Sequence, residues 1–259
     1  MPEAIIYEKK NHVAVLTMNR PEARNAMNAQ MREEMGEALE DFKGDIDSWV
    51  LIITGAGDRA FSAGMDLKEM AARLAGGTSP GGGGQNTPSL MAGNIDIWKP
   101  IIAAINGVAV GAGLETAMAC DIRIVAEEAQ VGLMEAKRGI TPGGKGTIRL
   151  PLLVPRGIAM EMLLTGDLIS GKEAHRIGLA NEVVPLAGLM DAAQKMAERI
   201  MDCAPLALQS IKETVHKTTG MPIEEALNAR FGINVSATDD AKEGTAAFAE
   251  KRKPEWKGK

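Results

Sequence analysis

Cysteine, tyrosine and histidine are scarce in this chain of 259 residues, and their scarcity limits the chemistry that it can carry out. Cys120 and Cys203 have neither the spacing of a zinc site nor that of a redox pair, so we expect no metal centre and a reduced, cytoplasmic compartment. The only tyrosine and histidines are Tyr7, His12, His175 and His216. None of them lies in the glycine-rich middle of the chain, so a catalytic tyrosine or histidine there would have to come from elsewhere.

Long apolar runs are absent as well. The richest stretch, residues 101–120, is interrupted by Asn106, Glu115 and three glycines, so it falls short of the roughly 18 apolar residues that a membrane span needs. Residues 1–10 lack the basic-then-apolar order of a signal peptide. The net charge of −5 argues against a broad surface for nucleic acid. We therefore expect neither a membrane nor a nucleic acid as a partner.

What is present is an alternation of short strands and helices. The hydrophobic patterns predict strands at residues 12–18, 49–54, 101–105, 108–110 and 122–125. They predict helices at residues 27–42, 67–74 and 114–120, with Asn25 as the cap of the first helix. This order is typical of an α/β chain wound in turns, although there is no strict sequence repeat. The length suggests one or two domains.

The last third of the chain changes character, because helical windows dominate from residue 156 and only residues 182–184 interrupt as a strand. The windows are residues 156–165, 171–177, 186–202, 205–219, 222–235 and 239–250. The last sixty residues are thus expected to form a helical appendage that packs on the first domain or on another subunit. Residues 76–88 contain four consecutive glycines, whose ordering costs much conformational entropy, and they predict a mobile loop.

Two turns of small residues are candidate binding loops. In Gly111-Ala112-Gly113 the backbone can approach a ligand closely, and free amides at the start of the following helix favour negative charge. Such amides stabilise an oxyanion by roughly 3–4 kcal/mol per well-placed donor. The pattern alone equally fits a plain strand-to-helix turn, and it lacks the third glycine of a dinucleotide fingerprint. Residues 61–67 form a similar loop, which could offer a second amide or simply start a helix.

Residues 139–146 nearly match the phosphate-binding loop G-x-x-x-x-G-K-[ST]. Gly146 stands where that motif needs a hydroxyl to hold magnesium, and Pro142 removes a backbone amide. No apolar strand leads directly into the segment. We therefore expect a structural turn here and not a nucleotide site.

Glu115 and Glu135 both stand in apolar surroundings. A carboxylate in such a setting either has a partner or has a raised pKa that suits proton transfer. Most of the 34 acidic residues are nevertheless expected to be solvated, and a spacing of 20 residues does not fix the distance between two side chains. The residues alone leave open whether these two carboxyls meet.

Several of these segments together resemble the crotonase (enoyl-CoA hydratase/isomerase) family, in the family's order and nearly end to end. The segments are residues 16–28, 61–67, 99–115, 119–123, 164–167 and 247–252. The resemblance implies an α/β fold, a crotonase-like ββα spiral with a C-terminal α-helical trimerisation region. We expect the acyl-CoA-binding spiral in residues 1–200 and the oligomerisation region in residues 201–259, in homotrimers that can pair into hexamers.

The resemblance also implies an acyl-CoA thioester as substrate and assigns roles to individual residues. Glu115 and Glu135 match the two catalytic glutamates of the hydratases, and the backbone N–H groups of Met65 and Ala112 match the donors that hold the thioester oxygen. The residues matched to coenzyme A and substrate binding are Arg24, Ser62, Ala63, Gly64, Asp66, Leu67, Gly111 and, reaching a neighbouring subunit, Phe248 and Lys251. No metal or cofactor is implied, since coenzyme A is part of the substrate.

The implied reaction is the reversible addition of water across the 2,3 double bond of a 2-enoyl-CoA. Two amides would stabilise the enolate-like charge, one glutamate would take a proton from water, and the other would act at Cα or orient the water. The alternatives are a carnitinyl-CoA dehydratase-like lyase, a Δ3,Δ2-enoyl-CoA isomerase, or a non-catalytic acyl-CoA- or RNA-binding scaffold. Isomerases of the family usually keep only the residue at Glu135, so Glu115 argues against that activity.

Three positions depart from the family pattern. Ala112 stands where glycine is common, but its amide is retained. Leu133-Met134 precedes Glu135 where short-chain hydratases often have Gln-Pro, and Lys145 replaces a small residue. These last two changes flank the implied acyl pocket, so the resemblance does not define the acyl group.

Overall fold

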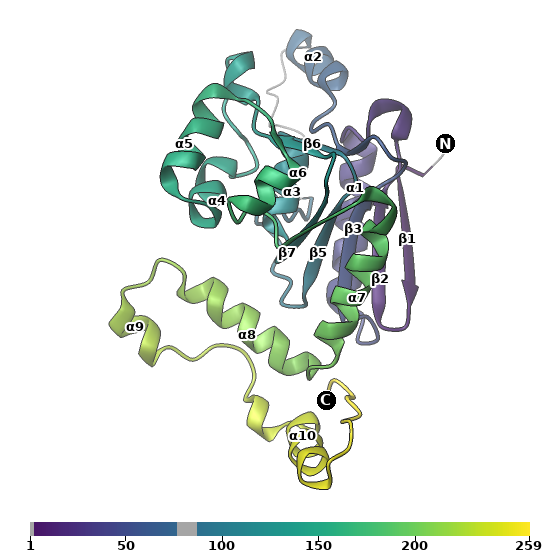
Figure 1. Cartoon of the computed structure of the whole chain (residues 1–259), viewed down its shortest axis with the longest axis vertical. Helices are drawn as coiled ribbons and strands as arrows, with labels where there is room; N and C mark the ends of the chain where they lie inside the picture. Colours follow the sequence, from purple (N-terminus) through teal and green to yellow (C-terminus); the bar gives the residue numbers. More distant parts are fainter. Residues whose placement is uncertain (1–2, 77–86) are drawn as a thin grey trace.

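The centre of the protein is a six-stranded sheet, seen in a computed structural model that describes residues 3–76 and 87–259 (Figure 1). The strands in spatial order are β1 (Ile5–Lys10), β2 (Val13–Met18), β3 (Val50–Gly55), β5 (Ile101–Ile105), β7 (Ile122–Ala126) and β10 (Glu182–Val184). β1 and β2 form an antiparallel hairpin, whereas β2 and all the strands beyond it run parallel. The predicted strands of this sheet are therefore confirmed. Most of the predicted glycine-rich loop at 76–88 lies outside the described residues.

A second, four-stranded sheet accompanies the first. Its strands in order are β4 (Ala60–Ser62), β6 (Val108–Val110), β8 (Gln130–Gly132) and β9 (Ile169–Ser170). Three times in succession the chain forms one strand of the large sheet, then one strand of the small sheet, then a helical segment. Those segments are α2 (Leu67–Ala75), α3 (Ala112–Ala119) and the 3₁₀ turn η2 (Glu135–Arg138). This repeated unit is the predicted ββα spiral.

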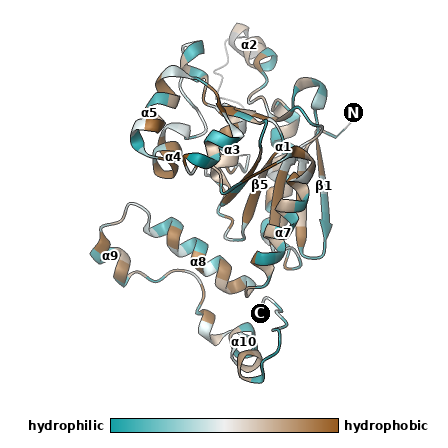
Figure 2. Ribbon diagram, in the orientation of Figure 1, coloured by the Kyte–Doolittle hydropathy of each residue, from teal (hydrophilic) through white to brown (hydrophobic). Residues whose placement is uncertain are grey.

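Helices cover both faces of the large sheet, so its central strands are buried on both sides. In β3, Leu51 and Ile53 share a core cluster with apolar residues of α1 (Ala29–Gly44), while Ile52 packs in a second cluster with residues of α7 (Leu189–Met201). All of β3 is buried, which explains why it is a continuous apolar run and not an alternating pattern. The edge strand β1 is more polar, as Figure 2 shows.

Helices α4 (Gly146–Leu153) and α5 (Arg156–Thr165) pack beside α3 and η2, and α6 (Gly171–Arg176) packs against β9 and β10. α4 was not predicted from the sequence, and it contains Pro151 within its span. The start of α3 was predicted at Leu114, whereas the helix begins at Ala112. That difference matters, because it makes the Ala112 amide one of the unpaired donors of the first turn.

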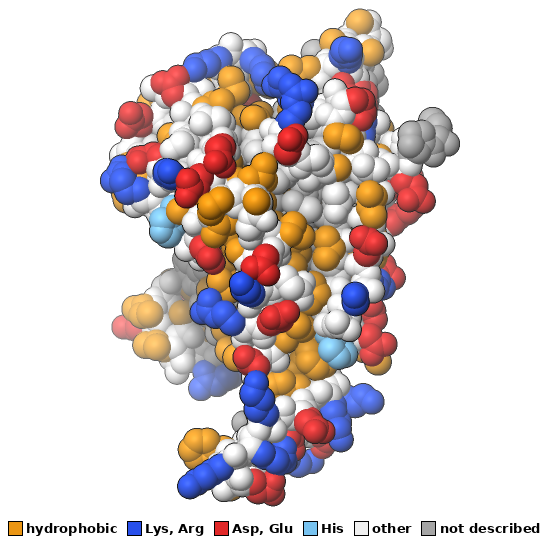
Figure 3. All heavy atoms as spheres, turned by 45° about the vertical axis from the view of Figure 1, so that its right-hand side comes forward, with side chains coloured by type: hydrophobic (Ala, Val, Ile, Leu, Met, Phe, Trp, Pro, Cys, Tyr) orange, Lys and Arg blue, Asp and Glu red, His pale blue; other side chains and the backbone are white. Residues whose placement is uncertain are grey.

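Beyond α7 the chain leaves the two sheets (Figure 1). Helices α8 (Pro205–Thr218), α9 (Ile223–Asn228) and α10 (Asp239–Glu250) project from the core, in line with the predicted helical appendage. Large apolar side chains on them remain exposed, among them Ile211 (61%), Val215 (62%), Ile223 (70%) and Leu227 (70%). Figure 2 colours parts of these helices as hydrophobic, and Figure 3 shows hydrophobic side chains on the surface of this region. The exact division at residues 200 and 201 stays a prediction.

The helix predicted at residues 222–235 is wrong in its extent, since α9 ends at Asn228. The chain then turns through Gly232, whose φ of +69° belongs to the left-handed region that favours glycine. An added Cβ at Gly232 would lie 2.5 Å from a carboxylate oxygen of Glu213 on α8. Packing of the turn against α8 thus overrides the helical spacing of the sequence.

Candidate active site

The start of α3 and the carboxyl of Glu135 lie against each other. Gly111 precedes the helix with φ +53° and ψ −126°, a backbone conformation suited to glycine. An added Cβ at Gly111 would lie 3.0 Å from Oε1 of Glu135, so glycine is also needed to leave room for that carboxyl. Glu115 lies one helical turn further on, where its N–H donates to the Gly111 carbonyl at 2.9 Å. The fold thereby brings the regions of the two predicted glutamates together.

The loop at residues 62–65 packs against the same helix start. An added Cβ at Gly113 would lie 2.4 Å from the Ser62 carbonyl oxygen, and one at Gly64 would lie 3.4 Å from the Ala112 nitrogen. The two turns of small residues noted in the sequence are therefore in direct contact. Their glycines are required by close approach of one backbone to the other.

The backbone N–H groups of Met65 and Ala112 are both unused within the part of the chain that the structure describes. Met65 is held by an isolated parallel bridge with Met27, in which Met27 N–H donates to the Gly64 carbonyl and Asp66 N–H donates to the Met27 carbonyl. This pattern leaves the intervening Met65 N–H without an acceptor. Ala112 is the first residue of α3, where no intrahelical acceptor exists.

Asn25 and Ser62 hold the Met65 loop in place. The Ser62 hydroxyl donates to the Asn25 carbonyl at 2.8 Å and accepts from Gly64 N–H at 3.2 Å. The Asn25 side chain is fully buried; it donates to the carbonyls of Ala56 and Ala60 and accepts from Arg20 N–H. The prediction that Asn25 caps the first helix is wrong. The cap of α1 is Asn28, which accepts from Met31 N–H at 2.9 Å.

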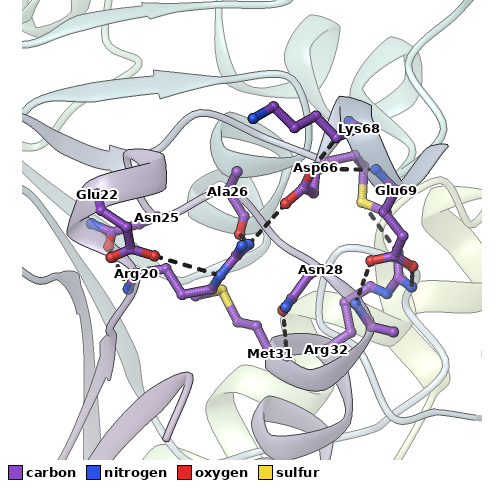
Figure 4. Close-up of polar contacts among 12 residues, drawn as sticks. Arg20, Glu22, Asn25, Ala26, Asn28, Met31, Arg32, Asp66, Lys68 and Glu69 are labelled. Carbon is purple, nitrogen blue, oxygen red and sulfur yellow. Dashed lines mark hydrogen bonds and ion pairs between the residues drawn. The ribbon is translucent and has the colours of Figure 1, made fainter. Parts of the chain in front are cut away.

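Ion pairs connect the start of α2 to α1 and to the segment before it (Figure 4). Arg20 donates to Asp66 Oδ2 at 3.0 Å, and Asp66 Oδ1 accepts from the N–H groups of Lys68 and Glu69. Burial alone would raise the pKa of Asp66, but the Arg20 hydrogen bond and these amides bring it below its ordinary value. A second pair, Arg32 with Glu69 at 3.2 Å, lies one turn further along α2. The carboxylate of Asp66 is thus engaged inside the protein, and its predicted contact to coenzyme A stays a prediction.

Glu115 is almost completely buried, at 2% exposure, and a glycine turn surrounds its carboxyl. Gly146 N–H donates to Oε1 at 2.8 Å, and an added Cβ at Gly144 would lie 2.7 Å from Oε2. Burial raises the pKa of Glu115, while the Gly146 and Gly144 amides and the charge of Arg149 oppose that rise. The segment that nearly matches a phosphate loop is therefore the support of a carboxyl group.

Glu135 is 9% exposed, and its Oε2 is buried without a hydrogen-bond partner among the described residues. Burial raises its pKa, and the charge of Glu115 raises it further. A buried carboxyl oxygen with no partner is costly for folding, which suggests that it is kept for a ligand or a water. The pKa values of both glutamates are thus raised toward neutral pH, the direction that suits a group exchanging protons, and their predicted catalytic role stays a prediction.

The remaining predicted binding residues divide into two groups. The first group, Arg24 and Leu67, lies next to the Met65 loop. Arg24 is exposed with φ +51°, and its carbonyl accepts from Ala63 N–H at 2.9 Å. Leu67 is 44% exposed at the start of α2. Phe248 (88% exposed) and Lys251 lie on α10 and at its C-terminal end, in the projecting region away from α3 (Figure 1). Within one chain the structure does not bring this second group to the glutamates.

The supporting roles of Asn25, Gly144, Gly146 and Arg149 were not predicted from the sequence. The glycines had a signal, since the match to a phosphate loop singled out their segment, but its meaning depended on which side chain the turn would meet. In residues 3–76 and 87–259 there is no group of three or more His, Cys, Asp or Glu side chains placed to hold a metal ion. No helix in those residues is both long and apolar enough to cross a membrane.

Comparison with known proteins gives the family. The chain matches the family model for enoyl-CoA hydratase/isomerase over residues 8–259. It is 42% identical over 268 residues to a carnitinyl-CoA dehydratase of Salmonella enteritidis PT4 (strain P125109), with 100% of both chains covered. Among solved structures, enoyl-CoA hydratases from Mycobacterium tuberculosis H37Rv (35% identity, 99% of this chain and 100% of that one) and Bacillus anthracis (34%, 99% and 100%) both give a TM-score of 0.86. The predicted fold is thereby confirmed, and the chain belongs to the enoyl-CoA hydratase/isomerase, or crotonase, family.

Proposed function

We propose that this protein is a hydro-lyase that adds water reversibly to the 2,3 double bond of a 2-enoyl-CoA thioester. The observation that carries the proposal is the pair of buried glutamates, Glu115 and Glu135, beside two unused backbone N–H groups. Relatives named carnitinyl-CoA dehydratase and structures named enoyl-CoA hydratase support it, since both names describe loss or gain of water on an acyl-CoA.

The Met65 and Ala112 amides are proposed to receive the thioester oxygen. When the water oxygen attacks Cβ, negative charge moves onto the thioester oxygen. N–H donors that are already in position stabilise this charge by roughly 3–4 kcal/mol each. The dipole of α3 acts in the same direction, because the oxygen would sit at its N-terminus. The methyl group of Ala112 does not affect its N–H, so alanine can replace the glycine that is common here.

The two glutamates are proposed to move the protons. One takes a proton from water as the oxygen attacks Cβ, and the other delivers a proton to Cα or orients the water, so that one molecule of water is added in total. Raised pKa values suit this exchange, because a carboxyl that ionises nearer to neutral pH can both accept and return a proton. The Oε2 atom of Glu135, which has no partner among the described residues, is free to accept a hydrogen bond from that water.

Binding of the coenzyme A portion is proposed along Arg24 and residues 62–67, which adjoin the Met65 amide. Phe248 and Lys251 would complete this site from a neighbouring subunit of a homotrimer. Support for an oligomer comes from the apolar side chains of α8 and α9 that stay exposed in one chain, such as Ile211 and Leu227. A stable assembly would remove this surface from water.

A carnitinyl-CoA dehydratase-like activity is the second candidate. It is favoured by the 42% identity to proteins of that name, compared with 35% or less to the solved enoyl-CoA hydratases reported above. The same carboxyl pair and amides would serve both reactions, because dehydration of a 3-hydroxyacyl-CoA is hydration run backwards. Only the acyl pocket distinguishes the two substrates.

The test is to add crotonyl-CoA to the purified protein and follow the absorbance of the conjugated thioester. A hydratase is supported if the wild type removes this absorbance and neither Glu115→Gln nor Glu135→Gln does. Glu128→Gln, at an exposed glutamate outside the site, should behave like the wild type. A panel of acyl-CoAs that includes carnitinyl-CoA then ranks substrates by kcat/KM. Tight acyl-CoA binding without turnover of any of them would contradict the proposal in favour of a binding scaffold.

A further inference from the structure

Arg149 on α4 is a partly buried cation that is bound only by main-chain oxygens among the described residues. Its Nη1 donates to the carbonyls of Met91 at 2.6 Å and Gly144 at 2.8 Å, and its Nη2 donates to the carbonyl of Leu90 at 3.0 Å. No ion pair joins it to a described carboxylate. A guanidinium withdrawn from water without a counter-ion is costly, so its position calls for an explanation.

The position of Arg149 follows from how α4 begins. Lys145 has φ +69°, a left-handed residue that reverses the chain, and Gly146 then starts the helix with its N–H directed at Glu115. Arg149 lies three residues further, on the same face as Gly146, and its side chain reaches back to the Gly144 carbonyl. The glycine turn is therefore held between two groups, the Glu115 carboxyl and the Arg149 guanidinium.

Arg149 also joins this turn to a segment 58 residues earlier in the sequence, through Met91 and Leu90. Three carbonyls at different points in space match the planar fork of a guanidinium, which donates in fixed directions. A lysine ammonium in the same place would keep the charge but could not hold all three. The geometry thus separates the charge of Arg149 from its hydrogen bonding, and each can be tested.

The charged groups around Glu115 come from several elements. Arg149 on α4 is the cation whose charge acts on Glu115, and the charge of Glu115 in turn acts on Glu135 of η2. Arg138 on η2 acts on Glu135 instead, and the exposed Lys145 directs its Nζ toward Gly93. Arg149 is therefore the cation that opposes part of the rise that burial causes in the pKa of Glu115.

We propose that Arg149 is a positioning residue, which fixes the Gly144–Gly146 turn so that Gly146 N–H meets Glu115 and whose positive charge favours the ionised form of that carboxyl. This inference rests on the proposed function, because it assigns Glu115 a part in catalysis. It leaves the acyl-CoA contacts to other residues, so Arg149 acts on turnover and not on affinity for coenzyme A.

The test compares Arg149→Met, which removes charge and fork, with Arg149→Lys, which removes only the fork. Arg156→Met, at an exposed arginine on α5, is the matched control. We expect Arg149→Met to lower kcat roughly 10- to 100-fold with KM changed less than about threefold. In the pH profile of kcat/KM, the acidic limb of Arg149→Met should shift to higher pH by about one unit, since loss of a nearby positive charge raises the pKa of Glu115. Arg149→Lys should lower kcat while keeping the acid limb of the wild type.

Titration of Glu115 by ¹³C NMR of carboxyl-labelled glutamate, assigned from the signal missing in Glu115→Gln, gives a readout that needs no turnover. A higher titration midpoint in Arg149→Met supports the proposal, and an unchanged midpoint with unchanged kcat overturns it, even if Tm falls. If Arg149→Met does not fold, an Arg149→Lys variant with full kcat overturns the role of the fork. A wild type that turns over no acyl-CoA refutes the proposed function, while the NMR titration still decides whether Arg149 controls Glu115.

Discussion

A methyl group added to the turn that surrounds Glu115 should slow catalysis strongly without unfolding the protein. In Gly144→Ala the new Cβ would lie 2.7 Å from Glu115 Oε2 and 2.9 Å from its Cδ, whereas ordinary contacts begin at 3.4 Å. Oε2 must therefore move by at least 0.3 Å to reach the 3.0 Å limit of real Cβ contacts, and by 0.7 Å to reach an ordinary contact. A displacement near 1 Å in a reacting group can cost about 10²-fold in rate, so we expect kcat to fall roughly 10²-fold.

Gly143→Ala is the control, because an added Cβ at the neighbouring glycine meets nothing within 4 Å. Neither glycine has a positive φ, so the two variants differ in what the methyl group touches and not in backbone strain. The assay is the initial rate of crotonyl-CoA hydration, with Tm from thermal unfolding measured alongside. We expect Tm of Gly144→Ala to fall by no more than about 4 °C, the effect of roughly 1 kcal/mol in a chain of this size. Equal kcat in the two variants would refute the placement of Glu115 in the reaction.

Replacement of the glutamates themselves should have separate effects on rate and stability. Glu115→Gln and Glu135→Gln should each lower kcat by roughly 10²-fold or more, and near-full activity in either would refute its role. Glu135→Gln should also raise Tm at pH 8 more than at pH 4.5. The pKa of Glu135 is higher in the folded than in the unfolded state. The contribution of this carboxyl to stability is therefore lost as the pH rises from the unfolded pKa through the folded pKa. A Tm at pH 8 equal to or below that of the wild type would contradict this reasoning.

Asn25→Ala should lower the free energy of unfolding by about 3 kcal/mol, near 1 kcal/mol for each of three buried hydrogen bonds. Asn19→Ala, with one exposed bond, should change it by less than about 0.5 kcal/mol in the same urea titration, and equal effects would show that the Asn25 network is unimportant.

The architecture of the core could be predicted from the sequence because local patterns determine it. The continuous apolar run of β3 indicates a strand buried on both faces, and the glycines before α3 indicate a turn where backbones come close. The order of strands and helices then leaves few ways to wind the chain. The resemblance to the crotonase family added the spiral, which the comparisons confirm.

The site itself depends on contacts that no local pattern contains. The spacing of Glu115 and Glu135 says nothing of their separation, which is set by the approach of Gly111 to the Glu135 carboxyl. Asn25 has the character of a helix cap, yet it is buried by hydrogen bonds to a segment more than thirty residues away. The same holds for Arg149, whose partners at Leu90 and Met91 become neighbours only after folding.

In the proposed mechanism two backbone amides and two carboxyl groups face the same reacting atoms. A crystal structure with a bound 3-hydroxyacyl-CoA or 2-enoyl-CoA analogue would test this arrangement. We predict the thioester oxygen within about 2.7–3.1 Å of both Met65 N and Ala112 N, with the carboxyls of Glu115 and Glu135 at Cα and Cβ. A thioester oxygen held by other donors, or an acyl chain directed away from the two glutamates, would contradict the account.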